Sequence, residues 1–148
     1  MEKVYFEDLS AGQRFVGTAT LTVTEEAVKD FAAKYDPQPF HLSDEGAKGT
    51  LFGELAASGW HTAAMTMKLL VADMRLAGGI IGGGGEIAWP QPTRPGDVLH
   101  VESEIVDVIP SKSRPERGMA VMRTETKNQK GETMQSITMK LVVPRRSA

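Results

Sequence analysis

Residues 58–77 read SGWHTAAMTMKLLVADMRLA, and apolar side chains recur along them at helical spacing. The apolar positions are Trp60, Ala63, Ala64, Met67, Leu70, Val71 and Met74. An apolar face of this width is typical of a helix that is buried against a sheet. The segment therefore predicts one long central helix, with these side chains turned toward a sheet.

The last third of the chain predicts the strands of that sheet. Apolar and polar side chains alternate through residues 97–110, 118–129 and 132–144, as expected for half-buried strands. Residues 128–131, NQKG, predict a hairpin turn between the last two strands. Residues 13–24 are rich in β-forming side chains and predict a first strand. Helices followed by antiparallel strands favour an α+β fold, with the long helix packed on a curved sheet.

A first helix is expected over residues 25–35, after Thr24 as its N-cap. It should end at Tyr35, because Asp36 precedes a proline and is pushed out of the helical conformation. After His41, one short helical turn at Ser43 and then a loop are expected.

Residues 82–85 are four consecutive glycines, and prolines follow at positions 90, 92 and 95. The glycines permit close approach of two backbones or a loop, and of these we expect a flexible turn; the prolines exclude a central strand where they lie. The glycines do not match a phosphate-binding loop, because neither Gly-Lys-Ser/Thr nor a GxGxxG pattern opening a helix is present.

With 148 residues the chain is large enough to bury a core, and we expect a single domain over residues 1–148. Its formal net charge of −2 gives no overall field that would attract nucleic acid or an anionic membrane. It contains no cysteine, which excludes disulfides and thiolate metal ligands. Because neither a signal segment nor an uninterrupted apolar run of ~18 residues is present, we expect a soluble, cytoplasmic protein.

The segment YDPQPFH, residues 35–41, is followed by ASGWHTAAM at residues 57–65 and by PTRPGD at residues 92–97. Together these motifs resemble the MaoC-like dehydratases, which include the (R)-specific enoyl-CoA hydratases and have the hotdog fold. The motif of that family runs Asp, any residue, Asn, Pro, an apolar residue and His. Its counterparts here are Asp36, Pro37, Gln38, Pro39, Phe40 and His41. The resemblance covers about residues 13–143.

The resemblance implies a hydratase or dehydratase that acts on an enoyl thioester, with an acyl-CoA as substrate and no cofactor. Asp36 would be the general base, His41 would orient the water and share its proton, and the amide of Gly59 would bind the thioester oxygen. A helix N-terminus is physically suited to that last task. The family works as dimers that share one extended sheet, so we expect a homodimer or a higher homo-oligomer.

The two prolines bear on the geometry that this chemistry needs. Five extended residues span roughly 17 Å, so Asp36 and His41 approach one water molecule only if the chain curls between them. Pro37 and Pro39, with their fixed φ angles, hold such a curl rigid. The sequence therefore predicts a preorganised base and imidazole.

Two positions depart from the family pattern. Gln38 replaces the usual Asn and is a longer amide that can still brace the loop. Hydratases of the family also carry a serine in the central helix that bonds the catalytic carboxylate, and its place here is taken by Met67, with Thr66 beside it. This departure leaves the orientation of Asp36 open.

Other candidate substrate contacts come from the same motifs and from a basic loop. We expect them at Gln38, Phe40, Ser58, Trp60, Lys112 and Arg114. The last two lie in the loop SKSRPERG, residues 111–118, where cations suit the phosphates of coenzyme A; the alternative is a solvated loop. His61 and His100 are expected to be structural and solvent-facing, respectively. The three histidines show no metal-binding spacing, so no metal site is expected.

Two other functions remain open at this point. A hotdog module that binds acyl-CoA without catalysis is favoured by Met67 in the place of the serine. A hotdog thioesterase would release free thiol from the same substrates. The feature that favours a hydratase is the Asp36/His41 pair joined by its proline-stiffened loop.

Overall fold

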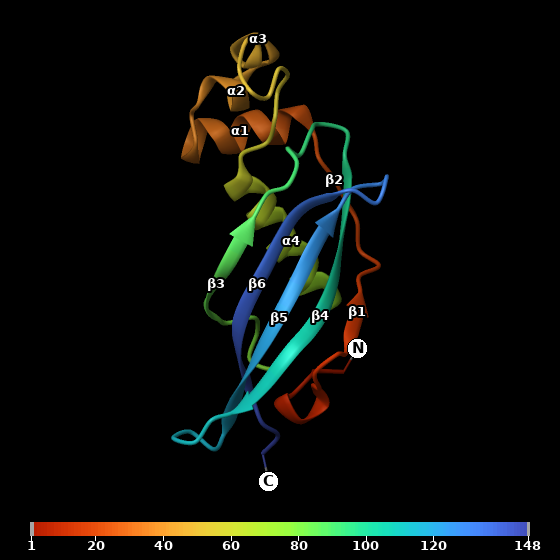
Figure 1. Ribbon diagram of the computed structural model, residues 1–148, viewed down its shortest axis with the longest axis vertical. Coiled ribbons are helices and arrows are strands. Elements are labelled where there is room, and N and C mark those ends of the chain that lie inside the picture. The colour runs from red at the N-terminus through yellow and green to blue at the C-terminus, as the bar shows by residue number, and fades with distance from the viewer. Residues whose placement is uncertain (1, 148) are drawn as a thin grey trace.

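The computed structural model describes residues 2–147, which form one antiparallel sheet and a set of helices on one side of it (Figure 1). The strands run in the order β1-β4-β5-β6-β3, and β2 also pairs with β4. Their bounds are β1 Arg14–Val16, β2 Leu21–Thr22, β3 Gly82–Ala88, β4 Val98–Pro110, β5 Arg117–Lys127 and β6 Thr133–Pro144. The helices are a 3-10 turn at Phe6–Asp8, α1 Glu25–Tyr35, α2 Pro39–Leu42, α3 Asp44–Ala47 and α4 Gly59–Asp73.

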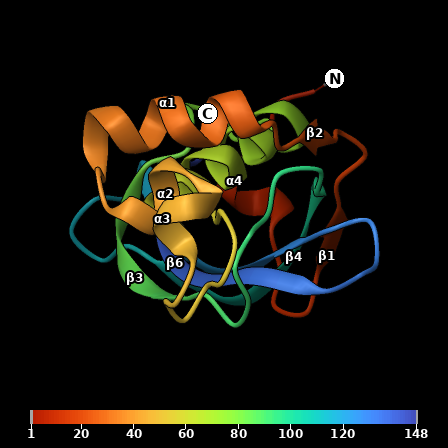
Figure 2. The same ribbon diagram turned by 90° about the horizontal axis from the view of Figure 1, so that it is seen from above.

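The sheet curves around α4, with α1 on the outer side of that helix (Figure 2). Helices α1, α2 and α3 gather at one end of the sheet, and the loop between β4 and β5 lies at the opposite end (Figure 1). The expected architecture, an antiparallel sheet wrapped around a long central helix, is confirmed. No helix within residues 2–147 combines the length and apolarity needed to cross a bilayer.

The predicted helix at residues 25–35 is present as α1, with the Thr24 hydroxyl accepting a hydrogen bond from the Ala27 amide at 3.1 Å. It ends at Tyr35, as the following Asp-Pro pair predicts. Ser43 caps α3 in the same way through the Gly46 amide. Helix α2 was not predicted; Pro39 stands at its first position, where a missing N–H costs nothing.

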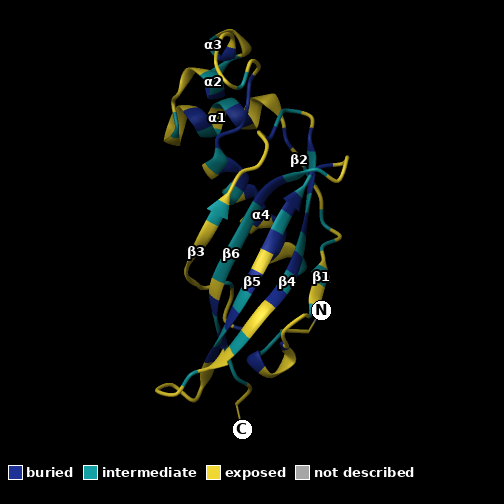
Figure 3. Ribbon diagram, in the orientation of Figure 1, coloured by how far each residue is buried: buried dark blue, intermediate teal, exposed yellow. Residues whose placement is uncertain are grey.

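The three long strands confirm the alternation that predicted them. In β4 the buried side chains are Leu99, Val101, Ser103 and Ile105, every second residue (Figure 3). Strands β5 and β6 are joined by the predicted turn, in which Gly131 has a φ of 76° that glycine adopts without strain. The expected strand over residues 13–24 is divided into the short strands β1 and β2.

The buried face of α4 differs from the expected one. The buried side chains of the helix are His61, Thr62, Met65, Thr66, Leu69 and Leu70. Trp60 and Val71, which were assigned to the core, are 61% and 58% exposed. The helix is turned in this way because Thr62 and Thr66 find polar partners on neighbouring segments, which a count of apolar residues does not register.

Residues 82–85 form the first half of edge strand β3, which corrects the expectation of a flexible turn. Strand β3 pairs only with β6, and its register shifts between Gly82 and Gly85. A Cβ atom at Gly85 would overlap the carbonyl of Thr138, so the glycine is needed for close approach of two backbones. The prolines that follow lie outside the sheet, as predicted.

Candidate active site

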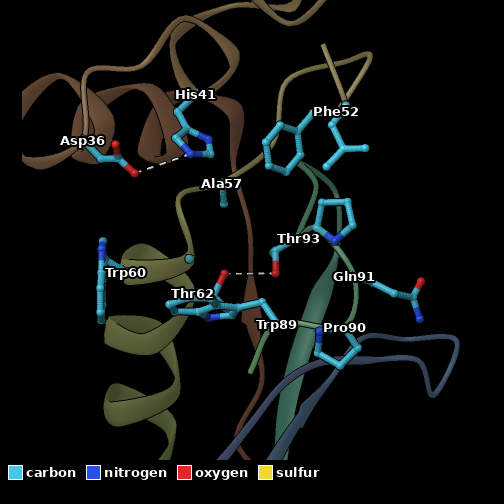
Figure 4. Close-up of a pocket in the computed structure, with 13 residues that line it drawn as sticks. Asp36, His41, Phe52, Ala57, Trp60, Thr62, Trp89, Pro90, Gln91 and Thr93 are labelled. Carbon is cyan, nitrogen blue, oxygen red and sulfur yellow. Dashed lines mark hydrogen bonds and ion pairs between the residues drawn. The ribbon is translucent and has the colours of Figure 1, made fainter. Parts of the chain in front are cut away.

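Asp36 and His41 come together where the chain turns from α1 into α2. Asp36 follows the last residue of α1, and its carbonyl accepts a hydrogen bond from the Gln38 amide at 2.8 Å, which closes a tight turn. Pro39 then begins α2, and His41 lies in that helix. The Asp36 Oδ2 and His41 Nε2 atoms lie 3.4 Å apart (Figure 4). The predicted curl between the two side chains is therefore present.

Each carboxylate oxygen of Asp36 accepts a hydrogen bond from a neighbouring side chain. The side-chain Nε2 of Gln38 donates to Oδ1 at 2.6 Å, and the Ser58 hydroxyl donates to Oδ2 at 2.7 Å. Partial burial alone would raise the pKa of Asp36, but these two bonds and the nearby His41 outweigh it and lower the pKa below its usual value. Asp36 is thus held as a carboxylate, the form that a base requires.

His41 is buried, and the bond that its other ring nitrogen makes fixes its orientation. Nδ1 lies 2.6 Å from the carbonyl oxygen of Ala56. A carbonyl only accepts, so Nδ1 carries a hydrogen and donates it. The ring therefore presents Nε2 to Asp36. When the ring is neutral, Nε2 and the carboxylate are both acceptors, and a water molecule that donates to each of them satisfies both.

The N-terminus of α4 lies beside this pair. Ser58 is its N-cap, and its hydroxyl oxygen accepts from the Trp60 amide at 3.2 Å while its hydrogen goes to Asp36. The Gly59 amide has no acceptor among the hydrogen bonds of residues 2–147. This free N–H at a helix N-terminus is suited to bind an oxygen that carries negative charge.

A cavity of about 450 Å³ opens in front of these groups. Asp36 and His41 lie on one side of it, and Thr62 and Trp89 lie on another (Figure 4). Gly59 also lines the cavity. Two further segments complete the wall: the loop with Leu51 and Phe52, and the proline-rich segment Pro90, Gln91, Pro92 and Thr93. Most of this lining is apolar, with few polar groups beside the Asp/His pair, which is the usual character of a small-molecule site.

The other expected substrate contacts are divided between this cavity and other places. Trp60 lines the cavity. Gln38 and Phe40 do not line it; Gln38 bonds Asp36, and the ring of Phe40 packs edge-on against His41 with centroids 4.6 Å apart. Ser58 is fully buried and contacts Asp36 instead of lining the cavity. These three residues thus contact the Asp/His pair, and their expected contact with substrate stays a prediction.

Lys112 and Arg114 lie elsewhere in the chain. They belong to the exposed loop between β4 and β5, at the end of the sheet opposite the cavity (Figure 1). Within one chain, therefore, the structure does not bring these cations to the site.

The serine that the carboxylate needs is present, but at a different position. Met67 is 37% exposed on α4 and does not line the cavity, whereas Ser58 makes the bond to Asp36 that the family serine makes. Sequence reasoning missed this bond because it looked for a serine at one position of the helix. The signal that was available is that Ser58 directly precedes the first helical residue, the position of an N-cap.

A metal site is a separate question from the Asp/His pair. Within residues 2–147, no three His, Asp or Glu side chains converge as ligands for a metal ion. His61 is buried against the ring of Phe31, with centroids 4.6 Å apart, and burial lowers its pKa, so it is held neutral.

Comparisons with known proteins point to one family. A family model described as "MaoC like domain" matches residues 8–129. The crystal structure of a MaoC-like dehydratase from Rhodospirillum rubrum is similar to this chain, with 53% identity and a TM-score of 0.94; the match covers 98% of this chain and 99% of that one.

Two relatives with named reactions are more distant. A 3-hydroxybutyryl-CoA dehydratase of Methylorubrum extorquens is 32% identical over 75% of this chain and 69% of that protein. A mesaconyl-CoA hydratase of Haloarcula marismortui is 26% identical over 96% of this chain. The chain spans only 40% of the length of that second relative.

Proposed function

The chain belongs to the family of MaoC-like dehydratase domains, and from that premise we propose that it adds water reversibly to the double bond of an enoyl thioester. An enoyl-CoA is the proposed substrate, since the two relatives with named reactions described above are named for CoA thioesters. The observation that carries the proposal is the 3.4 Å approach of Asp36 Oδ2 to His41 Nε2 at the wall of a cavity that also contains the N-terminus of α4.

The proposed reaction begins with one water molecule held between the two side chains. Asp36 takes a proton from this water as its oxygen attacks C3 of the substrate, so that a C–O bond forms and the C2=C3 π electrons move toward the thioester carbonyl. The lowered pKa of Asp36 keeps the carboxyl group deprotonated at neutral pH, the form in which it can act as a base. His41 orients the water through Nε2, and its ring is fixed by the Ala56 carbonyl.

The charge that reaches the thioester oxygen needs a donor. The unoccupied Gly59 N–H, at the positive end of the α4 dipole, is the group proposed for this task. A proton then adds to C2 and completes the hydration. Whether Asp36 or His41 delivers that proton stays open; in either case the pair begins and ends the cycle in the same protonation state.

The test is hydration of crotonyl-CoA, followed as loss of the absorbance of the conjugated thioester. We expect the wild-type protein to be active and Asp36→Asn to lose at least about a thousandfold in kcat, because an amide is no base. Asn keeps the size of the side chain and one acceptor oxygen, so circular dichroism should show an unchanged fold. An active Asp36→Asn protein would contradict the proposal.

The same assay separates the two alternative functions. A thioesterase would release free coenzyme A, which a thiol reagent detects. A non-catalytic binding module would bind enoyl-CoAs without consuming them. The Ser58–Asp36 bond removes the reason for which the binding module was favoured, since the carboxylate is oriented without a serine at position 67.

We further propose that the protein works as a homodimer paired through the edge of β3. Strand β3 is exposed and pairs on one side only, and an unpaired edge of this kind is a template for a second strand. Antiparallel pairing of β3 with its copy reverses the strand direction, which places the β4–β5 loop end of one copy beside the cavity end of the other. In that arrangement Lys112 and Arg114 remain candidates for binding the phosphates of coenzyme A. A cytoplasmic location stays a prediction.

A further inference from the structure

Two tryptophans stand where the cavity meets a second depression. Trp60 and Trp89 are in edge-to-face contact, with ring centroids 5.3 Å apart and planes at 84°. Both line the catalytic cavity, but Trp60 also lines an apolar groove of about 290 Å³ between α4, β3 and β6. We call this the α4–β3 groove; its walls are Trp60, Ala63, Gly82, Gly84, Gly85, Glu86, Ile87, Ile137 and Met139. The tryptophan pair therefore separates the cavity from the groove.

Trp89 is held firmly in place. Its indole N–H donates to the Gln135 Oε1 atom at 2.9 Å, and Gln135, which is completely buried, donates from Nε2 to the Thr66 hydroxyl at 3.2 Å. The Thr66 hydroxyl lies 2.5 Å from that of Thr126. Trp89 itself is 39% exposed, but Gln135, Thr66 and Thr126 are buried, and a hydrogen-bonded network anchored in the core in this way fixes the orientation of the indole. The indole also packs directly on Gly59, where an added Cβ would lie 2.7 Å from its Cε2 atom.

Trp60 is held less firmly. It is 61% exposed, and its indole nitrogen has no hydrogen bond among those of residues 2–147. The wall thus has one fixed part, Trp89, and one part that only packing holds. Beyond the wall, the α4–β3 groove offers an apolar lining and three glycines without side chains, a surface that suits an alkyl chain.

These observations rest on the proposed function and extend it to the choice of substrate. We infer that Trp89, positioned by Gln135, and Trp60 form the end wall of the acyl site and restrict the protein to short acyl groups. A longer acyl chain enters the α4–β3 groove only when this wall is opened. Gln135 acts here as a positioning residue, because it reaches the substrate only through Trp89.

Binding of saturated acyl-CoAs tests this inference separately from turnover, because butyryl-, hexanoyl- and octanoyl-CoA have no double bond to hydrate. We expect calorimetry to show that the wild-type protein binds octanoyl-CoA at least about tenfold more weakly than butyryl-CoA. Trp60→Ala and Gln135→Met should each raise the ratio of octanoyl to butyryl affinity by about tenfold. Gln135→Glu should retain the wild-type ratio, because a carboxyl group at this buried position is expected to be uncharged and so keeps an oxygen for the Trp89 N–H and a donor for the Thr66 hydroxyl.

The matched control is Val71→Ala, a truncation on the same helix outside both depressions, which should leave the ratio unchanged. An unchanged ratio in folded Trp60→Ala and Gln135→Met proteins would overturn the inference. Tight binding of octanoyl-CoA by the wild-type protein would overturn it as well. If the wild-type protein binds the saturated acyl-CoAs with the expected affinity ratio but hydrates no enoyl-CoA, the proposed function is contradicted and this inference is not.

Discussion

At the scale of single residues, the site depends on how Asp36 is kept charged and aimed. Gln38 and Ser58 each donate a hydrogen bond to one of its oxygens, and His41 approaches the oxygen that Ser58 bonds. Ser58 also caps α4, so one hydroxyl links the proposed base to the helix whose N-terminus carries the proposed oxyanion donor. The base and the donor are therefore positioned by the same side chain.

This link predicts a change in the pH profile of Ser58→Ala. The Ser58 bond favours the charged form of Asp36, so its loss should raise the pKa of that carboxyl. Since the base works only when deprotonated, the acid limb of kcat/KM should move to higher pH. The measurement is kcat/KM for crotonyl-CoA from acid to neutral pH. An acid limb at the wild-type position would show that the Ser58 bond does not tune Asp36.

The same variant has an expected effect on stability, which the pH profile does not report. Loss of an N-cap side chain costs about 1 kcal/mol, so the Ser58→Ala protein should unfold at a lower urea concentration than the wild type. Ser58→Thr retains a hydroxyl at the N-cap and is the matched control. If Ser58→Ala were as stable as the wild type, the capping interaction would be unimportant in solution.

The Asp36/His41 approach could be predicted from the sequence because two prolines leave the intervening chain few conformations. The hydrogen bonds that hold the two side chains in place could not be predicted in this way. The bonds from Ser58 to Asp36 and from His41 to Ala56 join segments that are distant in sequence, and no local pattern encodes them. The same holds for Trp89, whose indole is fixed by a residue of β6.

At the scale of the elements, α4 shows where apolar periodicity fails. The helix exists and lies on the sheet as predicted, but its buried face includes Thr62 and Thr66. Their hydroxyls bond Thr93 and Thr126, so they are buried at little cost. The strands carry polar residues at buried positions, among them Thr124, Thr126 and Gln135. These residues were a signal that the buried face of α4 would also include polar side chains.

Strand β3 allows a matched test of its glycines. Gly85→Ala would force a Cβ into the backbone of Thr138, whereas at Gly83 the nearest neighbour of an added Cβ is the Lys140 carbonyl oxygen at an ordinary 3.9 Å. We expect Gly85→Ala to lower the free energy of unfolding by about 1–3 kcal/mol and Gly83→Ala to have little effect. Urea denaturation measures both. Equal stability of the two variants would contradict the close approach of β3 and β6.

At the scale of the whole molecule, the apolar side chains that α4 exposes call for an explanation. Trp60, Met67 and Val71 lie on α4, and Ile81 and Trp89 flank β3. Together with the unpaired edge they form a surface that a second copy would cover. The fold class followed from the alternation and periodicity of the sequence, but an edge strand that begins with four glycines has no such pattern and was predicted as a turn.

Sedimentation equilibrium tests the assembly. We expect the wild-type protein to have twice the mass of its chain. Ile81→Lys places a charge beside the start of β3 at a residue that is 53% exposed, so the fold should persist while pairing of the edges is lost. Val71→Lys, at a residue of α4 that is 58% exposed, is an informative second variant, since it separates a contact through the helix from a contact through the strand edge. A dimer that survives Ile81→Lys would place the interface elsewhere.

The central claim is that Asp36 and His41 act on one shared water molecule, and a double-mutant cycle measures this most directly. The values needed are kcat/KM for crotonyl-CoA hydration by the wild type, Asp36→Asn, His41→Gln and the double variant. When two residues work as a unit, replacing both lowers kcat/KM little more than replacing one. The double variant should therefore have about the same kcat/KM as the less active of the two single variants. Losses that multiply in the double variant would show two independent roles and would contradict the shared water.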